Sequence, residues 1–290
     1  MKLTHARAVA LMVLVTLMWS IAGVVTRQLE QARSFEVTFW RSLFTALSLL
    51  VILPALQGRV VFSKLRHGGS ALWLSGLCWS VMFTAFMLAL TLTTVANVLV
   101  TMAVGPLLTA LIARLFIGHR IAPRTWLAIV AAGAGIVYMY GGNFAAGQAA
   151  GSLVALAVPL AGAINWTLTQ RSHARGQNVD LVPAVLIGAV LSSLYTLPLA
   201  LPLQATGHDI SLLALLGLVQ LAIPCTLAVM CARVLKAPEI SLLALLEVIF
   251  GIALAWLGAG EQPGARVMLG GALVIGALVA NEWIGWRQRA

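Results

Sequence analysis

The chain alternates between long apolar stretches and short polar breaks. A bilayer core of about 30 Å needs about twenty apolar residues in a helix, and stretches of about this length recur throughout the sequence. We therefore predict an all-α integral membrane fold of ten transmembrane helices, over residues 6–26, 35–56, 70–91, 94–117, 124–141, 150–170, 181–202, 211–232, 239–257 and 266–286. Several breaks are very short, so neighbouring helices should be antiparallel, because lipid does not tolerate irregular backbone.

The composition agrees with this class of protein. Hydrophobic residues make up 61% of the 290 residues, charged residues only 9%, and the mean hydropathy is +1.00. A soluble domain is about a quarter charged, so water could not solvate this surface. The formal charge of +10 does not indicate a nucleic-acid partner, because the basic residues lie in the short breaks rather than together on one face. We expect the lipid bilayer as the partner, and no nucleic acid.

The basic residues predict the orientation. If both termini are cytoplasmic, 14 of the 18 lysines and arginines fall on the cytoplasmic side, three fall outside, and Arg41 lies within a helix. Cytoplasmic loops of membrane proteins carry an excess of Lys and Arg. We therefore predict a multi-pass protein of the plasma (inner) membrane with both termini in the cytoplasm.

The sequence also repeats itself weakly. Residues 97–140 can be aligned with the stretch from Glu239 onward at an offset of 142, and Trp19-Ser20 resembles Trp166-Thr167 at a slightly larger offset. These matches divide the chain into residues 1–145 and 146–290, with five predicted helices each. Because five is odd, the second half must be inverted in the membrane. Inverted repeats are typical of transporters, with a substrate site near the midplane between the halves.

Short motifs support the same interpretation. Trp19-Ser20 in the first helix, Arg41 in the second, Ala96-Asn97 followed by Gly105-Pro106 in the fourth, and Gly260-Glu261 after the ninth resemble the drug/metabolite transporter superfamily. Within it, the chain is similar to the ten-helix EamA-type exporters. Two positions depart from the family pattern: His119 replaces a usual acid, and Val248 follows Glu247 where proline is common.

The resemblance implies that the protein exports small metabolites, with amino acids, including aromatic ones, as the favoured substrates. A multidrug or nucleotide-sugar carrier of the same superfamily is the main alternative, and an intramembrane enzyme is a remote one. The sequence contains no phosphate-binding loop, no catalytic motif and no metal-ligand spacing of Cys78, Cys225 and Cys231. We therefore predict no enzyme activity, no catalytic or metal-binding residues and no cofactor.

Two charged residues are predicted within the membrane. Glu247 lies about 12 Å into its helix at a rise of about 1.5 Å per residue, and ionisable residues at such depth are candidates for function. It is interpreted either as a proton-coupling or substrate-amine site, or as a structural acid. Arg41 is interpreted either as a ligand for a substrate carboxylate, or as a residue that extends to the membrane surface or pairs with Glu36 or Glu247.

Uncharged residues complete the predicted cavity. Asn97 and Thr101 lie four residues apart and so share one helix face, and Pro106 is expected to kink or break the same helix. Trp19, Trp79 and Trp166 lie deep in their helices, where their indole rings could stack on apolar or aromatic substrates; packing is the open alternative. Asn165 beside Trp166 is a buried amide that needs hydrogen-bond partners, either in a core network or on a substrate.

Small residues fill the last helix of each half: Ala131, Gly133 and Gly135 in one, and Gly270, Gly271 and Gly276 in the other. Such residues allow helix backbones to approach closely. We interpret these two helices as scaffold or dimer contact, in a protein that is a monomer or a homodimer.

Overall fold

The computed structural model describes residues 3–117, 122–140, 146–174, 180–235, 240 and 243–287. This part of the chain is helical, without strands. Its elements are α1 (His5–Thr26), α2 (Ser34–Gln57), α3 (Val60–His67), α4 (Ser70–Leu92), α5 (Val95–Met102), α6 (Gly105–Ile117), α7 (Pro123–Tyr140), α8 (Ala146–Ala174), α9 (Val182–Ala200), α10 (Gly207–Leu215), the π-helix η1 (Leu216–Ala222), α11 (Ile223–Cys231), α13 (Leu246–Ala259) and α14 (Ala265–Arg287).

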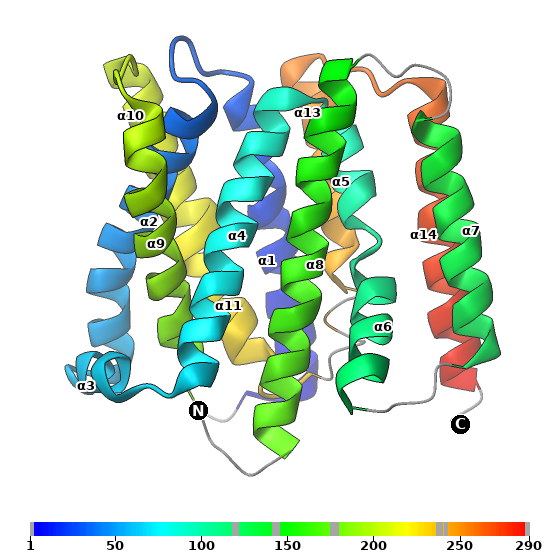
Figure 1. The fold of residues 1–290 in the computed structure, drawn as a ribbon, viewed down its shortest axis with the longest axis horizontal. Helices are drawn as coiled ribbons and strands as arrows, with labels where there is room; N and C mark the ends of the chain where they lie inside the picture. The colour runs from blue at the N-terminus through cyan, green and yellow to red at the C-terminus, as the bar shows by residue number, and fades with distance from the viewer. Residues whose placement is uncertain are drawn as a thin grey trace.

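The long helices run side by side in one bundle, as Figure 1 shows. Eight helical stretches of the described residues are long and apolar enough to cross a membrane, and α13 is a shorter apolar helix. The start of α1 at His5 and the end of α14 at Arg287 lie at the same end of the bundle (Figure 1), which we call the terminal end. The other end, with the loops after α1, α4, α9 and α13, is called the distal end.

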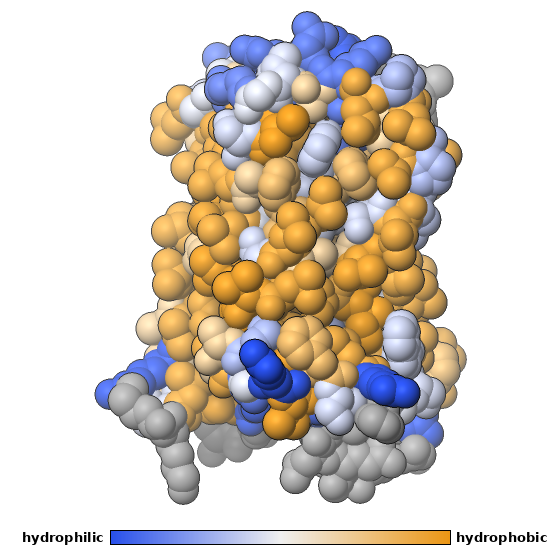
Figure 2. Space-filling view, turned by 90° about the vertical axis from the view of Figure 1, so that its left-hand side faces the viewer, coloured by the Kyte–Doolittle hydropathy of each residue, from blue (hydrophilic) through white to orange (hydrophobic). Residues whose placement is uncertain are grey.

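The outer surface of the bundle is apolar. Figure 2 shows a broad hydrophobic belt between two more polar ends. Large apolar side chains of other helices are also strongly exposed, among them Leu115, Leu127 and Leu257 at 79%, 72% and 82%. Continuous apolar surface of this extent is not found on soluble monomers, whereas lipid tails cover it without cost. The protein is therefore a multi-pass membrane protein.

The helices of the two halves make equivalent contacts. In the first half α1 packs on α11, η1 and α13; its counterpart α8 packs on α4, α5 and α6. Likewise, the contact of α4 with α9 corresponds to the contact of α10 and η1 with α2. Three further contacts join counterparts directly: α2 with α9, α5 with α13, and α7 with α14. Exchanging each helix with its counterpart in the other half therefore leaves this pattern of contacts unchanged.

Close contacts between small residues hold the outermost pair together. A Cβ atom added to Gly135 in α7 would lie 2.8 Å from the carbonyl oxygen of Gly270 in α14. Only a residue without a side chain allows this approach. Gly135 and Gly270, two of the small residues predicted to form scaffold or dimer contacts, therefore join α7 to α14 within the chain, whereas Gly271 faces Val100 of α5.

Two predicted helices are interrupted rather than continuous. The segment predicted over 94–117 is divided into α5 and α6 by a turn at Ala103 and Val104. Pro106 explains the break, because it has no N–H to donate to the carbonyl four residues earlier. In the second half Leu245 forms a turn just before α13, and the offset of 142 places it on Ala103. The two breaks lie at corresponding positions of the predicted repeats, although no proline lies at the second.

Two further elements differ from the prediction. The short helix α3 lies in a segment predicted as a loop. Its Val61 side chain is buried, whereas Lys64 and Arg66 of the same helix are exposed. The helix predicted over 211–232 begins earlier, at Gly207, and contains the π-helix η1 in its middle. Such π-helical turns inside longer helices are frequently found at functional sites.

Candidate substrate cavity

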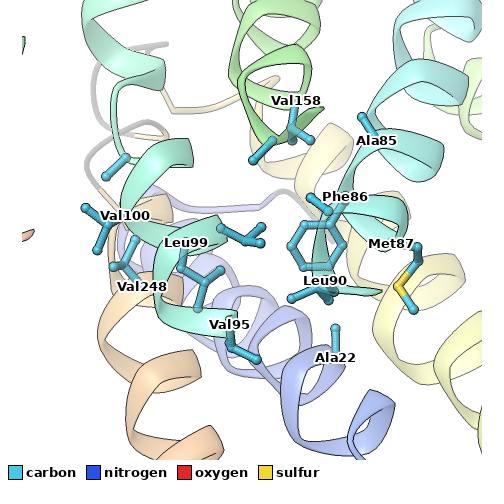
Figure 3. Packing of buried hydrophobic residues seen from close by; sticks show 14 of the residues in the cluster. Ala22, Ala85, Phe86, Met87, Leu90, Val95, Leu99, Val100, Val158 and Val248 are labelled. Carbon is cyan, nitrogen blue, oxygen red and sulfur yellow. The ribbon is translucent and has the colours of Figure 1, made fainter. Parts of the chain in front are cut away.

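A cavity of about 180 Å³ lies in the middle of the bundle, between the two halves. Residues from α1, α2, α4, α5, α6, α8, η1, α11 and α13 line it, and so do both helix breaks. Its walls are mostly apolar and aromatic. Four wall residues, Phe86, Leu99, Val158 and Val248, are labelled in Figure 3, where they come from α4, α5, α8 and α13.

The structure brings six of the nine predicted site residues together on this cavity: Trp19, Arg41, Trp79, Pro106, Trp166 and Glu247. Three of them are tryptophans from three different helices. The rings of Trp79 and Trp166 meet edge to face, with centroids 6.2 Å apart. The indole N–H of Trp79 is buried and has no acceptor among the described residues.

The other three predicted residues are buried away from the cavity and bond to neighbouring groups. Asn97 donates from Nδ2 to the Thr93 hydroxyl at 3.0 Å, and the Thr101 hydroxyl donates to the Asn97 carbonyl at 2.7 Å. The Asn165 amide oxygen accepts from the Ser75 hydroxyl at 2.6 Å, which joins α8 to α4. The polar stripe of the fourth predicted helix therefore faces the bundle interior but does not line the cavity.

Arg41 is fully buried on the wall of the cavity. Its Nη1 donates to Gln220 Oε1 at 3.2 Å and its Nη2 to the Phe83 carbonyl at 2.5 Å. The predicted pairing with Glu36 or Glu247 is not found: Glu36 accepts instead from the backbone N–H groups of the 204–205 loop. Among the described residues, Arg41 therefore bonds only to neutral oxygens.

Glu247 lies in the first turn of α13, beside the second helix break, and lines the same cavity. Ser20 of the Trp19-Ser20 motif donates to the Glu247 carbonyl at 3.3 Å and so ties α1 to the break. No hydrogen bond or ion pair to the Glu247 carboxylate occurs among the described residues. The acid thus faces the cavity without a basic partner in that part of the chain.

Among the polar residues of the cavity wall, the sequence analysis missed Gln220, Cys225 and Thr109. Gln220 and Cys225 both line the cavity, from η1 and α11. The signal for Gln220 is a single amide in the middle of an apolar run. Its side chain bridges two helices, accepting from Arg41 and donating from Nε2 to the Trp19 carbonyl at 3.5 Å.

Apolar packing fills the space between the cavity and the distal end. Ala22, Leu90 and Val95 are buried there in one cluster (Figure 3). A Cβ atom on Gly23 would lie 2.6 Å from a methyl carbon of Val95, so α1 and α5 are in close contact. On the distal side of this cluster, Arg27 donates to Glu261 at 3.0 Å and to the carbonyls of Leu90 and Thr93 at the end of α4. The cavity is therefore closed toward the distal end.

The described residues contain no group of three or more His, Cys, Asp or Glu side chains that could hold a metal ion. Within them, the polar side chains on the cavity wall are those of Arg41, Glu247, Gln220, Thr109 and Cys225, beside the aromatic rings. This set is suited to binding a small molecule that has an apolar part and polar ends.

Comparisons with known proteins agree with this arrangement. Residues 6–141 match the model of the EamA-like transporter family. No curated protein matches the chain, whereas 20 chains of solved structures do. One of these, described only as the crystal structure of a protein, aligns with a TM-score of 0.63 and 18% sequence identity, over 98% of this chain and 99% of that one. At this identity the likeness shows a shared fold over nearly the whole chain and carries no functional information.

Proposed function

Residues 6–141 belong to the EamA-like transporter family, consistent with a member of the drug/metabolite transporter superfamily, and on this premise we propose that the chain exports small metabolites. We propose amino acids with apolar or aromatic side chains as the favoured substrates. The observation that carries the proposal is the central cavity, whose wall combines three tryptophans with the charged residues Arg41 and Glu247. Such a wall fits a molecule with an apolar body and charged ends.

The size of the cavity favours small metabolites over the alternatives. Pockets that enclose drug-sized ligands measure about 300–1,000 Å³, whereas this cavity measures about 180 Å³. A nucleotide sugar would also bring two phosphates, for which the wall provides one buried arginine. The proposal therefore ranks multidrug and nucleotide-sugar transport below amino-acid export, and it ranks an intramembrane enzyme lower still.

We propose that all ten predicted segments cross the membrane as two inverted five-helix repeats, residues 1–145 and 146–290. The exchangeable helix contacts and the equivalent breaks at Ala103 and Leu245 support this. Discontinuous helices at a midplane site are typical of transporters with inverted repeats. The excess of basic residues at the terminal end supports a cytoplasmic location of both termini, in a plasma (inner) membrane.

Uptake into proteoliposomes tests the substrate class. We expect labelled phenylalanine and leucine to be transported, and a nucleotide sugar and a cationic dye to be transported poorly. Transport of the sugar or the dye alone would contradict the proposal.

Tryptophan variants test whether the cavity carries the activity. Trp19→Ala, Trp79→Ala and Trp166→Ala should each lower phenylalanine flux by about threefold to tenfold, because aromatic contacts contribute beyond simple burial. Trp73→Ala is the matched control, since Trp73 is 52% exposed and does not line the cavity. An equal effect of all four variants at equal abundance would assign the loss to folding.

Cysteine labelling tests the orientation. A cysteine at Gln57, at the terminal end, should react only with a reagent on the cytoplasmic side. A cysteine at Gln204, at the distal end, should react only from the other side. The reverse pattern would overturn the proposed orientation and would turn export into import.

A further inference from the structure

Arg41 carries a buried charge whose bonding partners in the described structure are neutral. The side chain is fully buried, and its two Nη atoms donate to an amide oxygen and a backbone carbonyl. Its Nε has no acceptor among the described residues. A buried cation is normally paired with an anion, because low-dielectric surroundings disfavour an isolated charge. The described surroundings of Arg41 therefore lack an anion that would compensate its charge.

The surrounding backbone holds Arg41 in place. The Thr45 hydroxyl donates both to the Arg41 carbonyl and to the Gly217 carbonyl, at 2.8 and 3.1 Å. A Cβ on Gly217 would lie 2.9 Å from the Arg41 carbonyl oxygen, so η1 contacts α2 without an intervening side chain. The π-helix η1 thus places the Gln220 side chain beside the Arg41 guanidinium, from which it accepts a hydrogen bond. Gln220 is neutral, so it orients Arg41 and leaves its charge uncompensated.

The second charge of the cavity lies apart from the first. Glu247 lines the cavity from α13, and no ion pair joins it to Arg41. Cys225 also lines the cavity, and most of the cavity wall is apolar or aromatic. A ligand that satisfies both charges must carry a negative and a positive group on one small molecule.

We propose that Arg41, oriented by Gln220, binds the carboxylate of a zwitterionic substrate, while Glu247 faces its ammonium group. This inference rests on the proposed function and specifies its recognition chemistry. Guanidinium groups bind carboxylates with two donors in a fixed geometry. Substrates that lack the carboxylate leave Arg41 unpaired in the cavity, and the transporter discriminates against them. Gln220 is a positioning residue, because it acts through Arg41.

The ratio of two fluxes tests the proposal. Phenylalanine carries both charges, whereas 2-phenylethylamine has the same ring and the ammonium group but no carboxylate. In proteoliposomes the wild-type protein should transport phenylalanine at least about tenfold faster than 2-phenylethylamine. Gln220→Glu places a carboxylate of nearly the same shape beside Arg41. This variant should reduce the flux ratio by about tenfold or more, because the introduced carboxylate pairs with the Arg41 guanidinium in place of the substrate carboxylate.

Matched variants separate recognition from folding. Gln57→Glu adds the same charge at the terminal end, where Gln57 already accepts from Lys64, and it should leave the ratio unchanged. Arg41→Lys keeps the charge but loses the two-donor geometry, so its ratio should lie between those of the wild type and Gln220→Glu. It serves as the second variant if Gln220→Glu does not insert.

The possible failures are distinguishable. If wild-type protein transports phenylalanine, but the folded Gln220→Glu and Arg41→Lys proteins keep its flux ratio, Arg41 is structural and only this inference falls. If wild-type protein transports neither compound nor any other amino acid, the proposed function falls, and this inference falls with it.

Discussion

The distal and terminal ends of the bundle use carboxylates in different ways. At the distal end three acids bind backbone N–H groups of the other half of the chain. Asp209 accepts from the N–H groups of residues 30–32 at 2.7–2.9 Å, and Glu36 accepts from those of residues 204 and 205. Glu261 accepts from Val95 N–H at 2.7 Å and from Arg27. These bonds fasten one half of the molecule to the other.

At the terminal end, Asp180 binds two long, flexible side chains instead. Lys64 Nζ and Arg233 Nη2 lie 2.9 and 2.7 Å from its oxygens, and these side chains are 41% and 51% exposed. Burial of Asp180 opposes ionisation. Hydrogen bonds from Lys64 and from the Val182 N–H, with the charges of Arg233 and Lys64, outweigh it and hold the pKa of Asp180 below its ordinary value.

The difference indicates which end opens more readily. Hydrogen bonds from backbone N–H groups to a buried charged group contribute about 1.5–3 kcal/mol each, whereas exposed ion pairs contribute about 0–1 kcal/mol. Separating the halves at the distal end therefore costs more than separating them at the terminal end. A transporter with this asymmetry rests closed toward the distal side, and under the proposed export function it must break the distal bonds to release its substrate there.

The largest expected effect is the removal of the Asp209 charge. Asp209→Asn replaces a carboxylate that is fully buried and accepts from four backbone N–H groups, including that of Thr206. The asparagine NH₂ group would face N–H donors, so at least one donor loses its partner. We expect a loss of about 2–4 kcal/mol in the free energy of unfolding, measured by denaturation in detergent.

Glu30→Gln is the control for this variant. Glu30 lies in the loop between α1 and α2 whose N–H groups bind Asp209, is exposed, and accepts one hydrogen bond from the Thr206 hydroxyl at 3.1 Å. The Glu30→Gln variant should therefore lose little free energy of unfolding. Equal stabilities of the two variants would mean that Asp209 does not fasten the distal end.

A smaller effect is expected from the bond between Arg27 and Glu261. The Arg27 side chain is 30% exposed, so Glu261→Gln should weaken the distal closure by only about 1 kcal/mol. This corresponds to about a fivefold increase in opening. Labelling of the native Cys225 measures this distal opening, because Cys225 lines the cavity. An impermeant thiol reagent on the distal side should label Cys225 about threefold to tenfold faster.

Arg266→Gln removes another exposed charge at the distal end and should leave this labelling rate unchanged. If Glu261→Gln labels no faster than wild type, the Arg27–Glu261 bond does not control distal opening.

Much of the fold could be predicted from the sequence, because apolar length is a local property. Eight of the predicted segments coincide with helical stretches of the described residues that are long and apolar enough to cross a membrane, and Pro106 marked one of the two breaks. The short helix α3 was missed because its eight residues carry only a brief mixture of apolar and basic positions. The π-helix η1 was missed because an inserted residue leaves no trace in a uniformly apolar run.

The candidate site was predictable only in part. Trp19, Trp166 and Glu247 were selected for their depth in their helices, and they line the central cavity, because a residue at mid-helix lies at mid-bundle. Depth does not specify which face of a helix a residue occupies, and so Asn165 lies outside the lining. The partners of Arg41 were not predictable, since Gln220 is separated from it by 179 positions. The distal carboxylate bonds depend on equally distant contacts.

The smallest effect is expected at the terminal end, from Asp180→Asn. Because Lys64 and Arg233 are about half exposed, solvent screens both pairs, and the loss of stability at pH 7 should be less than about 1 kcal/mol. The folded-state pKa of Asp180 is lowered, so its contribution is present above the unfolded-state pKa and is lost as the pH falls through the folded-state pKa. Melting curves of wild type and variant should therefore differ at pH 7 and converge below about pH 3.8, the ordinary value for Asp. High salt at pH 7 should reduce the same difference, since exposed pairs are screened. A loss as large as that of Asp209→Asn, or one insensitive to salt, would mean that the terminal end is fastened as firmly as the distal end, and the proposed asymmetry of opening would be wrong.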